Sequence, residues 1–219
     1  MTHPILHAGR GRRIGRLGGS FNPAHEGHLF VSHVARRQLG LDEIWWLVTP
    51  HNPLKPVDGM LSFSERLHRA RAFAKGARIW VTGLEAGLGT HFTVDTIACL
   101  KRRVPLCRFA WLMGADNLAG IHLWKHWERL FAMIPIAVFD RAPYSLTCLT
   151  GRAAIRYRRC RIQGHQARSL VLRKPPVWAL IVGHRHGASA TAIRSGDMRF
   201  AFADQTIRDM SKGRFIHSS

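Results

Sequence analysis

Short apolar runs alternate with longer stretches of helical periodicity along most of the chain. Runs such as EIWWLVT and VWALIV are nearly continuous in hydrophobic residues and do not alternate with polar ones. A continuous run of this kind is typical of a parallel strand that is buried on both faces. The pattern therefore predicts strands at residues 14–18, 43–49, 78–82, 109–113, 134–139 and 177–182.

Helices are expected between these strands, because several of the intervening stretches carry helix start or stop signals. Gly40 follows the last periodic residue of one stretch, and Ser62 with Glu65 forms a capping-box pattern at the start of another. The predicted helices are 27–39, 62–75, 93–103 and 117–129. Residues 50–61 and 83–92 are expected to be loops, and the Arg-rich stretch 141–175 is interpreted as a helical excursion.

Strands that alternate with helices predict right-handed crossovers and an α/β fold. We expect a doubly wound, mainly parallel, Rossmann-like sheet with helices on both faces. In such sheets, ligands bind at the carboxyl ends of the strands, where the winding direction reverses. Unusual segments follow predicted strands at 18–28, 49–56, 114–117 and 183–194, so we expect them to meet at one edge and form one site.

The composition is that of a globular chain, with 46% hydrophobic and 21% charged residues in 219. This length suits a single domain, expected at 14–219 after a basic flexible tail at 1–13. The longest apolar run, 130–139, is too short for a membrane span. The N-terminus lacks the apolar region of a signal peptide, so we expect a cytoplasmic protein. The 4 cysteines show no C-x-x-C pairing, which favours free thiols and no protein-bound metal.

The net charge of +20 has three interpretations. It can attract polyanionic substrates, it can bind nucleic acid, or it can reflect an arginine bias on solvated faces. Most of the arginines are scattered, and only 152–161 resembles a basic stripe. A basic RNA-binding module is therefore the alternative to an enzyme. It needs aromatic side chains interleaved with the charge, and the stripe offers only Tyr157, so nucleic acid is not the expected partner.

The stretch IGRLGGSFNPAHEGHL at 14–29 combines an apolar strand, a glycine turn and the start of a helix. Gly18 and Gly19 can take positive φ and leave no side chain between the backbone and a ligand. The helix N-terminus offers unpaired N–H groups and a positive dipole end, which together suit phosphate. His25 and His28 project from one face of the first turn and can donate to phosphate oxygens. The alternative is a surface loop followed by a helix with two incidental histidines.

Other candidate residues also have a structural alternative. Asp116 follows a predicted strand in MGADN, where a carboxylate can accept from ribose hydroxyls. It can equally cap the following helix, as can Thr93 at the start of 93–103. Trp124 can stack on a flat heterocycle or pack in the core.

GGSFNPAHEGH resembles the GG-x-F-x-P-x-H-x-G-H signature of the nucleotidyltransferase superfamily that is marked by H-x-G-H. More narrowly, the chain resembles the bacterial nicotinate-nucleotide adenylyltransferases, and the matching elements cover most of 14–196. The resemblance implies transfer of an adenylyl group from ATP to nicotinate mononucleotide in NAD biosynthesis. The products would be nicotinate adenine dinucleotide and pyrophosphate.

The resemblance also implies roles for individual residues. His25, His28 and Arg194 are the expected catalytic residues, with the histidines donating to the α- and β-phosphates and Arg194 holding the leaving pyrophosphate. The segment at 189–194 resembles the family pattern I-S-x-T-x-I-R, from which the chain departs in having Ala188 where an Ile is usual and Ala190 where a second Ser is common. The residues expected to bind ATP and its phosphates are Gly18, Gly19, Ser20, Phe21, Asp116, Ser189 and Thr191.

The pyridine nucleotide is expected to lie among residues from three segments. The resemblance assigns Lys55 to a loop that binds the substrate phosphate, and the backbone at Phe92 and Thr93 to the pyridine carboxylate. It assigns Trp124 to stacking on the ring. Mg²⁺ is expected as a cofactor that ATP oxygens and water hold. Related adenylyltransferases that act on nicotinamide mononucleotide or phosphopantetheine are the enzymatic alternatives, and a homo-oligomer is compatible with the sequence.

Overall fold

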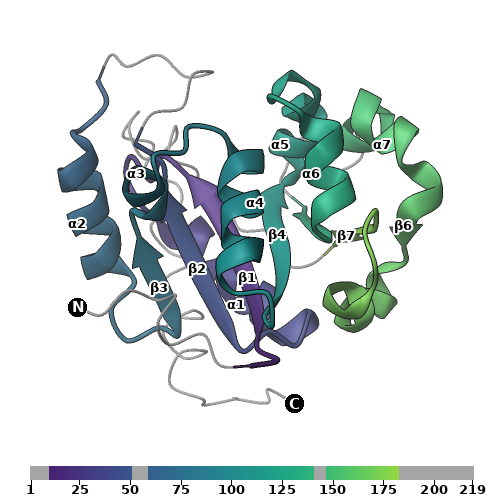
Figure 1. The fold of residues 1–219 in the computed structure, drawn as a ribbon, viewed down its shortest axis with the longest axis horizontal. Helices are drawn as coiled ribbons and strands as arrows, with labels where there is room; N and C mark the ends of the chain where they lie inside the picture. Colours follow the sequence, from purple (N-terminus) through teal and green to yellow (C-terminus); the bar gives the residue numbers. More distant parts are fainter. Residues whose placement is uncertain (1–9, 51–58, 141–146, 183–219) are drawn as a thin grey trace, which may run out of the picture.

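The computed structural model describes residues 10–50, 59–140 and 147–182. In this part of the chain, every paired strand is parallel, in one sheet of 7 strands with the order β3-β2-β1-β4-β5-β7-β6 (Figure 1). The predicted doubly wound α/β fold is confirmed. The strands are β1 Arg13–Gly19, β2 Glu43–Val48, β3 Ile79–Thr82, β4 Arg108–Gly114, β5 Ile136–Phe139, β6 Arg161–Ile162 and β7 Trp178–Ile181.

The winding direction reverses at β1. From β1 the chain proceeds to β2 and β3 on one side, and then returns to place β4 and β5 on the other. Because all pairs are parallel, the carboxyl ends of these strands lie along one edge of the sheet. The turns after β1 and β4 are therefore neighbours at the reversal, where open α/β sheets bind ligands.

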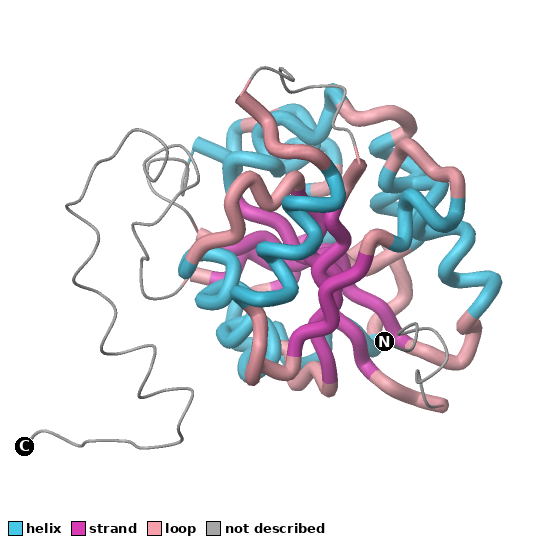
Figure 2. Tube along the Cα trace, turned by 90° about the vertical axis from the view of Figure 1, so that its left-hand side faces the viewer, coloured by secondary structure: helices cyan, strands magenta, loops and turns pink. Residues whose placement is uncertain are grey.

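Helices cover both faces of the sheet, which crosses the middle of the molecule (Figure 2). Alternate strand residues supply the two core layers, because successive side chains of a strand point to opposite faces. One layer contains Trp45, Trp111 and Trp178, and the other contains Trp46. The first layer packs against α3 Leu84–Leu88, α4 Thr93–Arg103, α5 Ala115–Gly120, α6 Trp127–Met133 and α7 Arg152–Arg156, and the second against α1 Glu26–Gln38, α2 Phe63–Phe73 and the 3-10 helix η5 Gly164–Leu172.

Two local predictions were wrong. The glycine-rich stretch 83–92 contains the short helix α3, which the sequence pattern did not indicate. The predicted helix over 117–129 is divided into α5, the 3-10 helix η2 at Ile121–Leu123, and α6. The break lies at Trp124, which is extended, and His126, which has a φ of 52°. Trp124 packs edge-on against Trp111 there, so tertiary packing overrides the helical spacing.

The described part of the excursion is mainly helical, as expected. It comprises α7, η5 and two further 3-10 helices, η3 at Thr147–Thr150 and η4 at Arg158–Cys160. It also contributes the edge strand β6, which pairs with β7. A strand of 2 residues is too short to leave a hydrophobic pattern, so it could not be predicted.

A buried arginine interrupts the first core layer. Arg16 of β1 is fully buried, and none of its side-chain nitrogens has a hydrogen-bond partner among the described residues. Its guanidinium carbon lies 3.5 Å from the ring centroid of Phe109 and 5.6 Å from that of Trp45. Burial lowers the pKa of Arg16 to about 9, well below the ordinary value of an arginine. The aromatic rings therefore compensate only part of the cost of desolvating this charge.

Replacing Arg16 with Met is expected to raise the free energy of unfolding at pH 7 by about 1–4 kcal/mol, because a buried charge gives way to an apolar side chain of similar length. The unfolded chain binds the Arg16 proton more tightly than the folded chain does. The penalty is therefore complete below pH 9 and is relieved as the pH rises above about 9. Denaturant unfolding at pH 7 and pH 10 should show the two proteins converging at the higher pH. A less stable Arg16→Met protein at pH 7 would contradict this account.

Candidate active site

The turn after β1 is shaped by Phe21 and by the two glycines before it. The left-handed φ that the sequence suggested for Gly18 and Gly19 belongs instead to Phe21, at 48°. Such a conformation is costly for a residue with a side chain, and the buried Phe21 ring is held by stacking on Trp46 at 5.0 Å between centroids. Gly18 is needed for a different reason. A Cβ there would lie 2.5 Å from the Trp111 ring, whereas one at Gly19 would meet Phe21 at 3.4 Å.

His25 and His28 form a reciprocal cap at the start of α1. The Gly27 N–H donates to Nδ1 of His25 at 3.1 Å, and the His25 N–H donates to Nδ1 of His28 at 3.2 Å. The two ring centroids are 3.9 Å apart. The predicted helix start is therefore confirmed. In addition, the imidazoles accept backbone N–H groups as the Ser and Glu side chains do in an ordinary capping box.

This cap fixes the tautomer of both rings. A backbone N–H can only donate, so each Nδ1 must be an unprotonated acceptor. The hydrogen of each neutral ring then lies on Nε2. Both rings are thus prepared as Nε2–H donors, which is the form that a phosphate oxygen requires. His25 is only 4% exposed, whereas His28 is partly exposed.

Ser32 and Trp46 stabilise the same turn through hydrogen bonds. The Trp46 Nε1–H donates to Oγ of Ser32 at 2.8 Å, and the Ser32 hydroxyl donates to the His28 carbonyl at 2.7 Å. Phe21 lies against the His28 ring, with centroids 4.7 Å apart. The position of His28 is therefore set by its own backbone, by Phe21 and by the second strand.

Arg66 of α2 connects the loops that follow β1 and β2. Its Nη1 donates to the carbonyls of Ser20 at 2.6 Å and Thr49 at 2.9 Å. Its Nη2 donates to Pro50 at 2.8 Å, and its Nε donates to Leu61 at 3.0 Å. Arg66 is 2% exposed, and burial lowers its pKa. Sequence reasoning missed this residue, because its four acceptors are far apart along the chain.

The residues predicted to bind the pyridine nucleotide are linked through aromatic contacts. Trp124 contacts Trp111 edge-on, with centroids 6.4 Å apart, and Trp111 lies against Gly18. The ammonium of Lys125 lies 4.2 Å from the ring centroid of Phe92. Thr93 begins α4, directly after Phe92. The structure thus connects Trp124 both to the glycine turn and, through its neighbour Lys125, to the start of α4.

The capping alternatives for Asp116 and Thr93 are wrong. Gly114 is the N-cap of α5, and Asp116 lies in the first turn of that helix. Phe92 is the N-cap of α4, and no side chain caps that helix. Asp116 follows β4 at the winding reversal, beside the strand that leads to the histidine pair.

Glu85 is a further carboxyl group near the carboxyl edge that the sequence did not single out. It lies on α3, directly after β3, and is buried. Burial raises the pKa of the Glu85 carboxyl, and a hydrogen bond with the Thr49 side chain acts in the opposite direction. The contact joins α3 to the end of β2, so Thr49 connects Glu85 to the loop that Arg66 holds.

Four predicted site residues lie outside the described residues: Lys55, Ser189, Thr191 and Arg194. The strand that precedes the last three, β7, ends at Ile181 at the same edge of the sheet as β1 and β4. In the part of the chain that the structure describes, no helix is long and apolar enough to cross a membrane.

Known proteins resemble this chain in sequence and in fold. The model of the cytidylyltransferase-like family matches residues 17–196. A probable nicotinate-nucleotide adenylyltransferase of Methylorubrum extorquens (strain PA1) is 47% identical over 183 residues, which is 84% of this chain and 99% of that protein. A protein of the same name from Gluconobacter oxydans (strain 621H) is 48% identical over 188 residues, 85% of this chain and 96% of the relative.

A solved structure has the same fold. It is the Plasmodium falciparum nicotinic acid mononucleotide adenylyltransferase complexed with NaAD, with a TM-score of 0.62 at 19% identity. The superposition covers 84% of this chain and 83% of that chain.

Replacing Arg66 with Lys is expected to lower the free energy of unfolding by about 2–4 kcal/mol, because one ammonium cannot reach four carbonyls that a planar guanidinium bridges. The matched control is Arg69→Lys on the same helix. Arg69 is exposed and pairs with Glu65, so its replacement should cost less than about 0.5 kcal/mol. Denaturant unfolding of both variants measures the difference, and equal losses would show that Arg66 does not hold these loops.

Proposed function

The chain belongs to the cytidylyltransferase-like family and, within it, to the nicotinate-nucleotide adenylyltransferases. From this premise we propose that the site joins ATP to nicotinate mononucleotide, giving nicotinate adenine dinucleotide and pyrophosphate. The observation that carries the proposal is the pair of imidazoles at the winding reversal, directly after a glycine turn, each of which accepts a backbone N–H at Nδ1.

The reaction needs no nucleophilic side chain. A phosphate oxygen of the mononucleotide attacks the α-phosphorus of ATP and forms the new P–O bond. The bond from the α-phosphorus to the bridging oxygen breaks, and pyrophosphate leaves with the electron pair. Since the attacking group is already an anion, the protein contributes position and charge stabilisation.

His28 has the main phosphate contact in this proposal, because more of its ring is exposed than that of His25. His25 orients His28 through its backbone N–H and offers its small exposed edge to the neighbouring phosphate. Backbone N–H groups of the turn from Gly18 to Phe21 complete the cradle, as unpaired donors near a helix start do in other phosphate sites.

The mononucleotide and the leaving group are assigned to the remaining predicted residues. Trp124 stacks on the pyridine ring, and the backbone at Phe92 and Thr93 receives its carboxylate. Asp116 accepts from ribose hydroxyls. The aromatic contacts that link Trp124 to the glycine turn support this arrangement. Residues outside the described ranges complete the proposal: Lys55 on the mononucleotide phosphate, and Ser189, Thr191 and Arg194 on pyrophosphate.

Mg²⁺ fits this site as part of its ATP complex. Among the described residues, no group of three or more His, Cys, Asp or Glu side chains is placed to hold a metal ion. We therefore propose that phosphate oxygens and water hold the ion, as its coordination habits favour. Its contribution there is to neutralise phosphate charge.

Product analysis tests the proposed function directly. The protein is incubated with Mg²⁺, ATP and one acceptor at a time: nicotinate mononucleotide, nicotinamide mononucleotide or phosphopantetheine. We expect nicotinate adenine dinucleotide and an equal amount of pyrophosphate as the main products. Preferred turnover of either other acceptor, or no pyrophosphate with any of them, would reject the assignment.

His28→Ala is expected to lower kcat by roughly 10²–10³, the usual loss when one preorganised donor to developing charge is removed. The KM for nicotinate mononucleotide should change much less. His33→Ala, a histidine replacement further along the same helix, is the matched control and should keep near-normal kcat. Steady-state kinetics measure both variants. A kcat for His28→Ala close to that of the control would show that His28 does not contact the reacting phosphates.

A further inference from the structure

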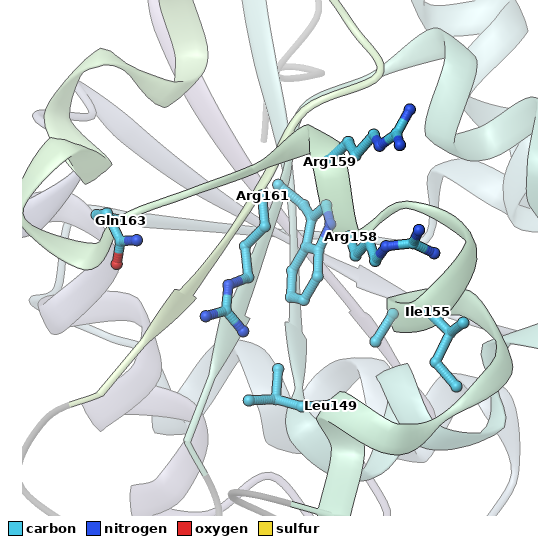
Figure 3. A pocket seen from close by; sticks show the side chains of 8 residues that line it. Leu149, Ile155, Arg158, Arg159, Arg161 and Gln163 are labelled. Atoms are coloured by element: carbon cyan, nitrogen blue, oxygen red, sulfur yellow. The ribbon is translucent and has the colours of Figure 1, made fainter.

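A pocket lies in the helical excursion, with a volume of about 520 Å³ (Figure 3). Leu149 of η3 and Ile155 of α7 form its apolar side. Arg158 and Arg159 come from η4, Arg161 comes from β6, and Gln163 directly follows that strand. Ligand pockets commonly have volumes of about 300–1,000 Å³, so this one can admit a small organic molecule.

The arginines of this pocket form no ion pair with another described residue. In the described part of the chain, no carboxylate forms an ion pair with Arg158, Arg159 or Arg161, whereas the nearby Arg156 pairs with Glu128 at 2.9 Å. All three side chains are exposed at the pocket. Guanidinium groups bind phosphate oxygens through paired hydrogen bonds, so the pocket favours an anion with several such oxygens.

The base of the pocket is fixed. Trp178 of β7 is 1% exposed, and its Nε1–H donates to the Tyr157 carbonyl at 2.8 Å. The Arg161 guanidinium lies 5.8 Å from the ring centroid of Trp178. The indole thus ties the start of η4 to the sheet, and Arg161 lies beside it.

The pocket is separate from the site described above. Arg161 and Trp178 begin β6 and β7 and are paired in register. They lie at the amino ends of these strands, whereas the histidine pair and Asp116 follow the carboxyl ends of β1 and β4. An occupant of this pocket would therefore bind in addition to the substrates.

We propose that this pocket binds a nucleoside polyphosphate at a second site. The guanidiniums of Arg158 and Arg159 receive the phosphates on one side of the pocket, and Arg161, which points to the other side, adds positive charge there (Figure 3). Leu149 and Ile155 contact the apolar faces of the nucleoside, and the Gln163 amide can donate to or accept from its polar edge. These residues take no part in the adenylyl transfer, so the second site is independent of the proposed function.

The same arginines lack the open aromatic faces of a surface that binds single-stranded RNA. Such surfaces alternate charge with open aromatic faces on which bases stack. Here Trp178 is buried, and Tyr157 is engaged in stacking on Phe131, with centroids 4.3 Å apart. The pocket is also concave and bounded by apolar side chains, which suits one compact ligand better than a strand.

The test is equilibrium dialysis of the full chain with labelled ATP and no mononucleotide. We expect 2 ATP molecules per wild-type chain, one at each site. In Arg158→Ala/Arg159→Ala, both changes are at exposed side chains, and affinity at the second site should fall roughly tenfold or more. The control Arg102→Ala/Arg103→Ala removes the same charge from exposed positions on α4 and should keep both sites.

The outcomes separate this site from general electrostatic attraction. Equal losses in the pocket variant and the control, or an unchanged stoichiometry in the pocket variant, would overturn the proposal. An RNA oligonucleotide that displaces the second ATP, with a steep salt dependence absent from the pocket variant, would assign the arginines to RNA instead. Retention of ATP at the active site alone in the pocket variant, with an unchanged melting temperature, would support the proposal.

Discussion

The structure depends most on two reciprocal hydrogen bonds at the start of α1. Each of His25 and His28 accepts a backbone N–H at Nδ1, and the imidazoles therefore serve as the helix cap and as the candidate phosphate donors at once. A ring that used Nδ1 as its donor could not accept these bonds, and the first turn of the helix would lose its cap. The same two hydrogen bonds consequently set both the start of α1 and the tautomer that phosphate binding requires.

Neighbouring side chains hold the two histidines in this arrangement. Ser32 binds the His28 carbonyl, Trp46 binds Ser32, and Phe21 in its left-handed conformation covers the His28 ring. Arg66 then ties the loop after β1 to the loop after β2 through backbone carbonyls alone. Residues on rigid strands and helices thus hold the site in place through hydrogen bonds. A site that acts by positioning its substrates needs such rigid support.

The sequence predicted every strand except β6, and also the common edge, because buried parallel strands are continuous apolar runs that begin and end at recognisable residues. Asp116 and the histidine pair were placed correctly at that edge for this reason. Arg66 could not be predicted, because its acceptors come together only in the folded chain. Arg16 contradicts the hydrophobic pattern of its own strand, and the break at Trp124 follows from packing on Trp111. Local patterns contain no information on such distant partners.

The tautomers of His25 and His28 can be measured in the nitrogen NMR spectrum of protein with labelled histidine rings, at a pH where the rings are neutral. His25→Gln and His28→Gln variants assign the two pairs of signals. We predict an unprotonated Nδ1 and a protonated Nε2 in both rings. A proton on Nδ1 of either ring would contradict this prediction, because that ring could then neither accept the backbone N–H nor present Nε2 as a donor to phosphate.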